Sequence, residues 1–189
     1  MITIAFLGVD GVGKSTQIAL LEAHLKQHGH TVSCIPFSAD KLRNIMHDTL
    51  CELMYTDSSL EHVATALEIR TKICLAMQDA TNNEFVLFDR YKWCRLAIAS
   101  VQNCKYMDVL RQLYSIFPTP SLVFYLYAKM DKLQCNLANK NEAESPEELL
   151  AFHHQYLQEI TGVRVVYINA NKNIMDVHKE IREALKGYY

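Results

Sequence analysis

The chain has 189 residues, half of them hydrophobic, and a formal net charge of −2. This size predicts one domain, and the near-neutral charge excludes the broad basic surface that a nucleic-acid polymer requires. No segment approaches the ~18 consecutive apolar residues of a membrane span, and the first residues do not resemble a signal peptide. Six cysteines without a C-x-x-C pair are typical of reduced thiols. We therefore expect a cytoplasmic protein that binds small ligands, with no membrane and no nucleic-acid partner.

Short apolar runs alternate along the chain with longer segments of helical periodicity. Strands are expected at residues 2–7, 31–36, 85–89, 121–127 and 164–169. Helices are expected at residues 14–29, 40–54, 58–80 and 145–160. This alternation predicts an α/β domain with a mainly parallel sheet.

Two of the expected helices carry start signals. Ser58 with Glu61 can form a capping box at the first of them. At the second, Ser145 is the expected N-cap, Pro146 suits the first turn, and Glu148 can complete the cap.

A phosphate-binding loop is predicted directly after the first strand, where GVDGVGKST matches the pattern G-x-x-x-x-G-K-[ST]. Backbone N–H groups of such a loop surround phosphate oxygens, and the N-terminus of the following helix adds partial positive charge. We expect Lys14 to reach the β and γ phosphates, and Ser15 to offer its hydroxyl to Mg²⁺. The residues expected to bind the nucleotide here are Gly8, Gly11, Val12, Gly13, Lys14, Ser15 and Thr16.

The third expected strand ends in the sequence FVLFDRY. A carboxylate at the carboxyl end of a strand beside the first one lies near the phosphates, so Asp89 is expected to hold Mg²⁺ or its water. Arg90 can then contact donor and acceptor phosphates together. Lys14, Asp89 and Arg90 are therefore candidate catalytic residues, and Ser15 and Asp89 are candidate metal ligands.

The segments FLGVDGVGKSTQIALLEAHLKQHGHTV and VLFDRY together resemble the thymidylate kinase family of P-loop nucleoside monophosphate kinases. The resemblance implies a three-layer P-loop fold with a five-stranded parallel sheet flanked by helices. It implies that residues 1–189 form a single kinase domain with a lid at about 129–146. It also implies ATP with Mg²⁺ as the donor, a nucleoside monophosphate as the acceptor, and often a homodimer.

The same resemblance implies an acceptor site. Asp10 matches a loop acid that contacts the acceptor sugar hydroxyl, and Arg70 falls where the family has an arginine on the helix lining the base pocket. Arg43 fits the helix after the acceptor loop. Phe37 and Tyr91 are the remaining expected acceptor contacts.

The chain departs from the family pattern on the acceptor side. Ala66 replaces a phenylalanine that usually stacks on the base, and the loop after the second strand contains Phe37 but no arginine. A pocket without stacking and polar groups discriminates poorly between acceptors. We therefore expect thymidylate or another phosphorylated small molecule to be accepted.

The lid is also unusual, because the chain has no arginine between Arg111 and Arg164. The charge facing the transferring phosphoryl group must then come from elsewhere. Lys129, Lys132 and Lys140 are candidates. Arg95, about one helical turn beyond Tyr91, is the preferred candidate, because an ordered guanidinium stabilises phosphate charge better than a mobile ammonium.

Other interpretations remain open at this point. NKNE at residues 139–142 resembles a guanine-reading motif, but it does not follow a strand and no switch motif accompanies it. Two histidine pairs, His24 with His28 and His153 with His154, lack the partners of a recognisable metal site. A kinase for a nucleoside or another metabolite, and a nucleotide-binding protein with weak or lost transfer, remain as alternatives.

Overall fold

A computed structural model describes residues 1–39, 58–138 and 145–188. Within them a five-stranded sheet has the order β2-β3-β1-β4-β5, and all four strand pairs are parallel. The strands are β1 (Ile2–Leu7), β2 (Val32–Pro36), β3 (Phe85–Asp89), β4 (Leu122–Tyr127) and β5 (Val165–Asn169). This confirms the predicted fold class, and each strand lies within one residue of its predicted range.

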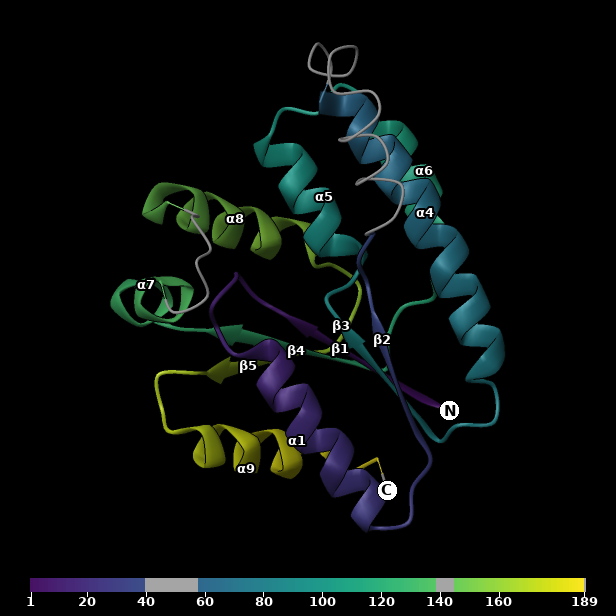
Figure 1. Ribbon diagram of the computed structural model, residues 1–189, viewed down its shortest axis with the longest axis vertical. Helices are drawn as coiled ribbons and strands as arrows, with labels where there is room; N and C mark the ends of the chain where they lie inside the picture. Colours follow the sequence, from purple (N-terminus) through teal and green to yellow (C-terminus); the bar gives the residue numbers. More distant parts are fainter. Residues whose placement is uncertain (40–57, 139–144, 189) are drawn as a thin grey trace.

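Seven helices flank the sheet in the described part of the chain (Figure 1). They are α1 (Lys14–Gln27), α4 (Ser58–Asp79), α5 (Lys92–Val101), α6 (Met107–Ser115), α7 (Met130–Ala138), α8 (Pro146–Glu159) and α9 (Ile174–Leu185). Helix α1 packs beside α9, α5 beside α8, and α4 beside α6. None of these helices is long and apolar enough to cross a bilayer.

The helix start at residue 145 is as predicted. The Ser145 hydroxyl accepts from the Glu148 N–H at 3.2 Å, and the Glu148 carboxylate accepts from the Ser145 N–H at 2.9 Å. Helix α4 is described from Ser58 onward, but the Ser58 side chain lies outside the described residues, so its capping box with Glu61 stays a prediction. The helix predicted at residues 40–54 lies outside them too. Helices α6, α7 and α9 were not predicted, and α5 was assumed only in the preference for Arg95.

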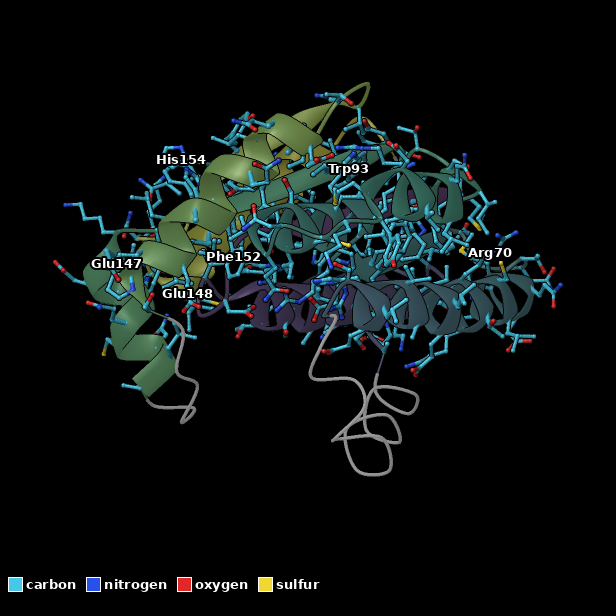
Figure 2. All side chains as sticks on the ribbon, turned by 90° about the horizontal axis from the view of Figure 1, so that it is seen from above. Arg70, Trp93, Glu147, Glu148, Phe152 and His154 are labelled. Carbon is cyan, nitrogen blue, oxygen red and sulfur yellow. The ribbon has the colours of Figure 1, made fainter. Side chains whose placement is uncertain are left out.

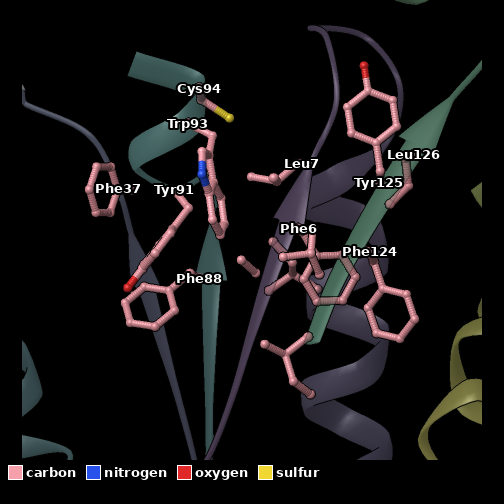
Figure 3. Close-up of a cluster of buried hydrophobic side chains, with 14 of the residues drawn as sticks. Phe6, Leu7, Phe37, Phe88, Tyr91, Trp93, Cys94, Phe124, Tyr125 and Leu126 are labelled. Atoms are coloured by element: carbon pink, nitrogen blue, oxygen red, sulfur yellow. The ribbon is translucent and has the colours of Figure 1, made fainter. Parts of the chain in front are cut away.

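The central strands β1 and β4 are buried along almost their whole length, as strands covered on both faces must be. An aromatic cluster fills the space where β2 and β3 end (Figure 3). The Tyr91 ring lies 5.1 Å from that of Phe37, 4.9 Å from that of Phe88 and 5.5 Å from that of Trp93. The buried Tyr91 hydroxyl donates to the Pro118 carbonyl at 2.6 Å. These contacts fix the chain directly after Arg90.

The predicted phosphate-binding loop is packed against the end of β4. Gly8 has a φ of +136°, and a Cβ atom there would lie 2.3 Å from the Leu126 carbonyl oxygen. That separation is far below van der Waals contact, so only glycine fits.

We expect Gly8→Ala to destabilise the protein more than Gly29→Ala. Gly29 also has a positive φ, +86°, but its added Cβ meets no atom within 4 Å. Gly29→Ala should therefore cost only the backbone strain, roughly 1–2 kcal/mol, whereas Gly8→Ala should cost about 3 kcal/mol or more. Chemical denaturation of both variants measures this difference, and equal losses would contradict the packing described.

Three histidines meet where α1 packs against α9. The His24 ring lies 4.2 Å from that of His28 and 5.9 Å from that of His178. Burial, with the nearby charge of Arg182 and then His24, lowers the pKa of His178. Burial, with the charges of His28 and Arg182, lowers the pKa of His24. His178 Nδ1 is buried without a hydrogen-bond partner among the described residues.

This cluster predicts a loss of stability in mild acid. Because the folded chain binds these protons more weakly than the unfolded chain, stability falls as the pH drops below about 6.5. His178→Leu should therefore lose less unfolding free energy than the unsubstituted protein between about pH 7.5 and about pH 5.5. Denaturant titrations at both pH values test this, and an identical loss in the two proteins would count against it.

Candidate active site

Glycine conformations shape the loop between β1 and α1. Gly11 and Gly13 have φ values of +75° and +98°. Gly13 is the N-cap of α1, and the first intrahelical bond joins the Gln17 N–H to the Gly13 carbonyl at 3.2 Å. The preceding N–H groups of α1 have no intrahelical partner, as at any helix N-terminus. They remain available to an anion.

Lys14 is held inside this loop by carbonyl oxygens. Its ammonium donates to the carbonyls of Gly8 at 3.0 Å and Val9 at 2.9 Å, and it lies 3.4 Å from Asp10 Oδ1. Burial and the neighbouring Arg90 guanidinium lower the pKa of Lys14, while the Asp10 carboxylate opposes both effects. The side chain is 6% exposed, so its position is set by the loop itself.

Asp10 joins Lys14 to Arg90. Arg90 Nη2 donates to Asp10 Oδ1, the same oxygen that faces the Lys14 ammonium. Burial alone would raise the pKa of Asp10, but Lys14 and Arg90 outweigh it and hold that pKa below its usual value. The carboxylate therefore stays ionised between two cations.

Arg90 reaches this position through an unusual backbone. It is one of two non-glycine residues with a positive φ in the described chain, at 69°. That conformation costs roughly 1–2 kcal/mol for a residue with a Cβ. The Arg90 N–H still donates to the Phe6 carbonyl at 3.0 Å, so the chain turns out of β3 only after the last bond to β1. The turn directs the guanidinium to Asp10.

The Ser15 hydroxyl and the Asp89 carboxylate meet where α1 faces the end of β3. The Ser15 hydroxyl donates to Asp89 Oδ2 at 2.9 Å. Mg²⁺ prefers hard oxygen ligands and usually takes only one or two from the protein, with water and phosphate completing its shell. A hydroxyl and a carboxylate side by side at a phosphate-binding loop fit this donor set.

These groups line one cavity of about 880 Å³, within the range of small-molecule sites. Its walls come from the loop and the start of α1, from the end of β3, from α7, and from the segment that joins β5 to α9. The lining residues are Asp10 to Gln17, Asp89, Arg90, Lys132, Asn136, Ala170, Lys172 to Met175 and Val177. They include four cations and two carboxylates, a net formal charge of +2.

The structure brings together most of the residues predicted for the donor side. Gly11, Val12, Gly13, Lys14, Ser15, Thr16, Asp89 and Arg90 all line the cavity, as does Asp10. Gly8 lies behind the loop, against β4.

The residues predicted for the acceptor side are more scattered. Phe37 and Tyr91 are 0% and 1% exposed in the aromatic cluster, so neither ring faces the cavity. Arg70 is half-buried on α4 and does not line the cavity; it lies at the far side of the molecule from Phe152 of α8 (Figure 2). Arg43 lies outside the described residues.

Arg95 also stands apart from the cavity lining. Helix α5 starts directly after Tyr91, as the preference for Arg95 required. Arg95 nevertheless does not line the cavity, and its charge acts on Tyr114 of α6, where it opposes the increase in pKa that burial causes. Among the lid lysines, Lys132 lines the cavity, Lys129 is exposed outside it, and Lys140 lies outside the described residues.

Sequence reasoning missed several residues of this site. Asn136 and the segment 170–175 contribute a whole wall of the cavity. The order β1-β4-β5, which brings the carboxyl ends of these strands to one edge, became visible only in the folded structure. Tyr156 of α8 does not line the cavity and is 2% exposed; burial and the neighbouring Cys94 raise its pKa, and the charge of Arg90 opposes that increase.

Comparisons with known proteins agree with this geometry. A family profile described as thymidylate kinase matches residues 6–181. The thymidylate kinase of Thermoanaerobacter sp. (strain X514) is 22% identical over 200 residues, covering 98% of this chain and 97% of the relative. That of Chlorobium luteolum is 26% identical, covering 96% and 95%. That of Campylobacter hominis is 27% identical, covering 97% and 99%. Because the profile extends from β1 into α9, the chain belongs to the thymidylate kinase family.

Proposed function

We propose that this protein transfers the γ-phosphoryl group of ATP to thymidylate, giving ADP and thymidine diphosphate, with Mg²⁺ as the cofactor. The observation that carries the proposal is the convergence of Lys14, Arg90 and the Ser15–Asp89 pair on one end of the cavity. Family membership supports an ATP-dependent phosphotransferase, and the relatives named thymidylate kinase support this acceptor over the alternatives.

The charge of the cavity suits a polyphosphate. Lys14 and Arg90 face the same end, and Asp10 fixes their separation. Preorganised cations stabilise the charge that develops in the transition state without the cost of reorganising at that moment. In this account Lys14 contacts the donor phosphates, Arg90 lies between donor and acceptor phosphates, and the ionised Asp10 accepts from an acceptor hydroxyl.

Ser15 and Asp89 are the residues that would hold Mg²⁺. Bound there, the ion would neutralise phosphate charge. Asp89 also holds the Ser15 hydroxyl in place, which keeps the first turn of α1 aligned with the end of β3.

The donor base has an apolar surface available. Ile174 and Met175 line the cavity, yet they are 57% and 60% exposed. Large exposed apolar side chains beside a binding cavity favour contact with a flat base. We assign them to the outer, adenine side of the donor site.

For the acceptor side we propose Asp10 in the cavity, Arg70 on α4 outside the cavity lining, and Arg43. Phe37 and Tyr91 would act there through packing, because both are buried. Ala66 is 0% exposed in the core, so it offers no stacking surface. A contribution of Arg95 to transfer stays a prediction.

Lys14→Ala should reduce acceptor-dependent ADP release by at least about 1,000-fold, because it removes a cation from the transferring phosphoryl group. Lys26→Ala is the matched control, since Lys26 lies on the same helix and pairs with Glu22 at the surface. Steady-state assays with thymidylate, thymidine and no acceptor give the comparison. Near-normal turnover of Lys14→Ala would remove the loop from the mechanism, and no thymidylate-dependent ADP release by the unsubstituted protein would refute the proposed reaction.

Discrimination against deoxyuridylate should be weak. Without a stacking ring at position 66, the thymine methyl group should improve kcat/KM by less than about tenfold. Parallel measurements with thymidylate and deoxyuridylate test this. A preference of about 100-fold or more would require a base-reading contact elsewhere in the chain.

A homodimer and a cytoplasmic location complete the proposal. Leu60, Leu67 and Leu75 are 47%, 48% and 58% exposed along one stripe of α4, a surface that favours self-association. The five cysteines of the described chain are free, which suits a reducing compartment. Sedimentation should show a dimer for the unsubstituted protein and a monomer for the Leu67→Glu variant. If both proteins are monomers, or if both are dimers of equal stability, the interface does not lie on this stripe.

A further inference from the structure

Helix α7 joins two walls of the cavity that are far apart in sequence. Asn136 Nδ2 donates to the Gly11 carbonyl of the phosphate loop at 2.7 Å. Lys132 Nζ donates to the Ala170 carbonyl at 2.6 Å and to the Lys172 carbonyl at 3.2 Å, both in the segment after β5. At the start of α7, the Lys129 N–H donates to Asn171 Oδ1 at 2.9 Å. In Figure 1, α7 lies beside the carboxyl ends of β4 and β5.

The contact between α7 and the loop is direct. Lys132 and Asn136 are four residues apart, so they share the helix face that lines the cavity. Leu133 and Leu137, also four apart, are buried at 3% and 2% exposure. A Cβ atom at Gly11 would lie 3.0 Å from the Leu133 carbonyl oxygen and 3.1 Å from Leu137 Cγ. The described part of α7 therefore forms a fixed wall against the loop.

Asn136 controls the orientation of a peptide group in the loop. In a trans peptide the C=O and the next N–H point in opposite directions. By holding the Gly11 carbonyl, Asn136 turns the Val12 N–H away from α7. The direction of one phosphate-binding donor thus depends on a side chain 125 residues away in sequence.

Lys132 brings a positive charge to the same wall. Within the described residues its two hydrogen-bond partners are carbonyl oxygens, which carry no charge to neutralise it. A lysine ammonium has three N–H donors, so one remains for a ligand in the cavity. The carbonyl bonds also hold the ammonium in place, which removes the main disadvantage of lysine relative to arginine.

We propose that α7 is a clamp for the donor nucleotide in which Lys132 contacts the polyphosphate and Asn136 is a positioning residue for the loop. The segment 170–172, tied to Lys132, is thereby coupled to the phosphate loop. This inference rests on the proposed function. It assigns to Lys132, rather than to Arg95, the positive charge that faces the donor phosphates in a lid without arginine.

The test is equilibrium binding of ATP in the absence of an acceptor. Lys132→Met, which keeps the side-chain length and removes the charge, should weaken ATP binding about tenfold or more. Lys129→Met is the matched control, because the Lys129 side chain is exposed outside the cavity, and it should bind as the unsubstituted protein does. Equal affinities of Lys132→Met and Lys129→Met would overturn the role of Lys132.

The positioning role of Asn136 is tested by comparing KM for ATP with KM for the acceptor, because a general loss of structure would change both. Asn136→Ala should raise KM for ATP about fivefold or more and leave KM for the acceptor unchanged, whereas Gln134→Ala, on the exposed face of α7, should change neither. Parallel rises in both KM values would contradict the positioning role.

A failure of the proposed reaction can be distinguished from a failure of the α7 clamp. If the protein binds ATP but releases no ADP with thymidylate, the reaction is wrong while the binding comparison still decides the clamp. If the unsubstituted protein does not bind ATP at all, both proposals are refuted.

Discussion

The site depends on one carboxylate oxygen. Asp10 Oδ1 faces both the Lys14 ammonium and the Arg90 guanidinium, so the two cations are held at a fixed separation before any ligand arrives. Without it, the buried Lys14 ammonium and the partly buried Arg90 guanidinium would repel each other; burial first, and then the charge of Arg90, lowers the pKa of Lys14. The strained backbone of Arg90 and the carbonyl bonds of Lys14 both serve this arrangement. The loop and the end of β3 therefore act as one unit.

The parallel sheet supplies the frame for that unit. Because β1, β3, β4 and β5 all end at the same edge, the loop, Asp89, α7 and the segment after β5 converge on one cavity. Gly8 allows the loop to pack on β4, and Asn136 supports it from the other side. The proposed donor site is thus built from four segments, and cations that lie far apart in a slightly acidic chain meet in one cavity.

Local sequence patterns were enough to predict the strands, the phosphate loop and the acid and arginine at the end of β3. Each is contiguous, and its residues already carry the geometry: glycines for positive φ and an acid at a strand end. The wall formed by α7 was not predictable in this way, because Asn136 meets Gly11 only after β4 has been placed beside β1. Phe37 and Tyr91 illustrate the same limit, since only tertiary packing shows that their rings fill the core rather than face a ligand.

Whether Asp10 and Arg90 act as one unit is measured by a double-mutant cycle on kcat. Asp10→Asn, Arg90→Gln and the double variant would be assayed with saturating ATP and thymidylate. If the pair acts as a unit, the double variant should lose far less than the product of the two single losses. Independent, multiplicative losses would contradict the account.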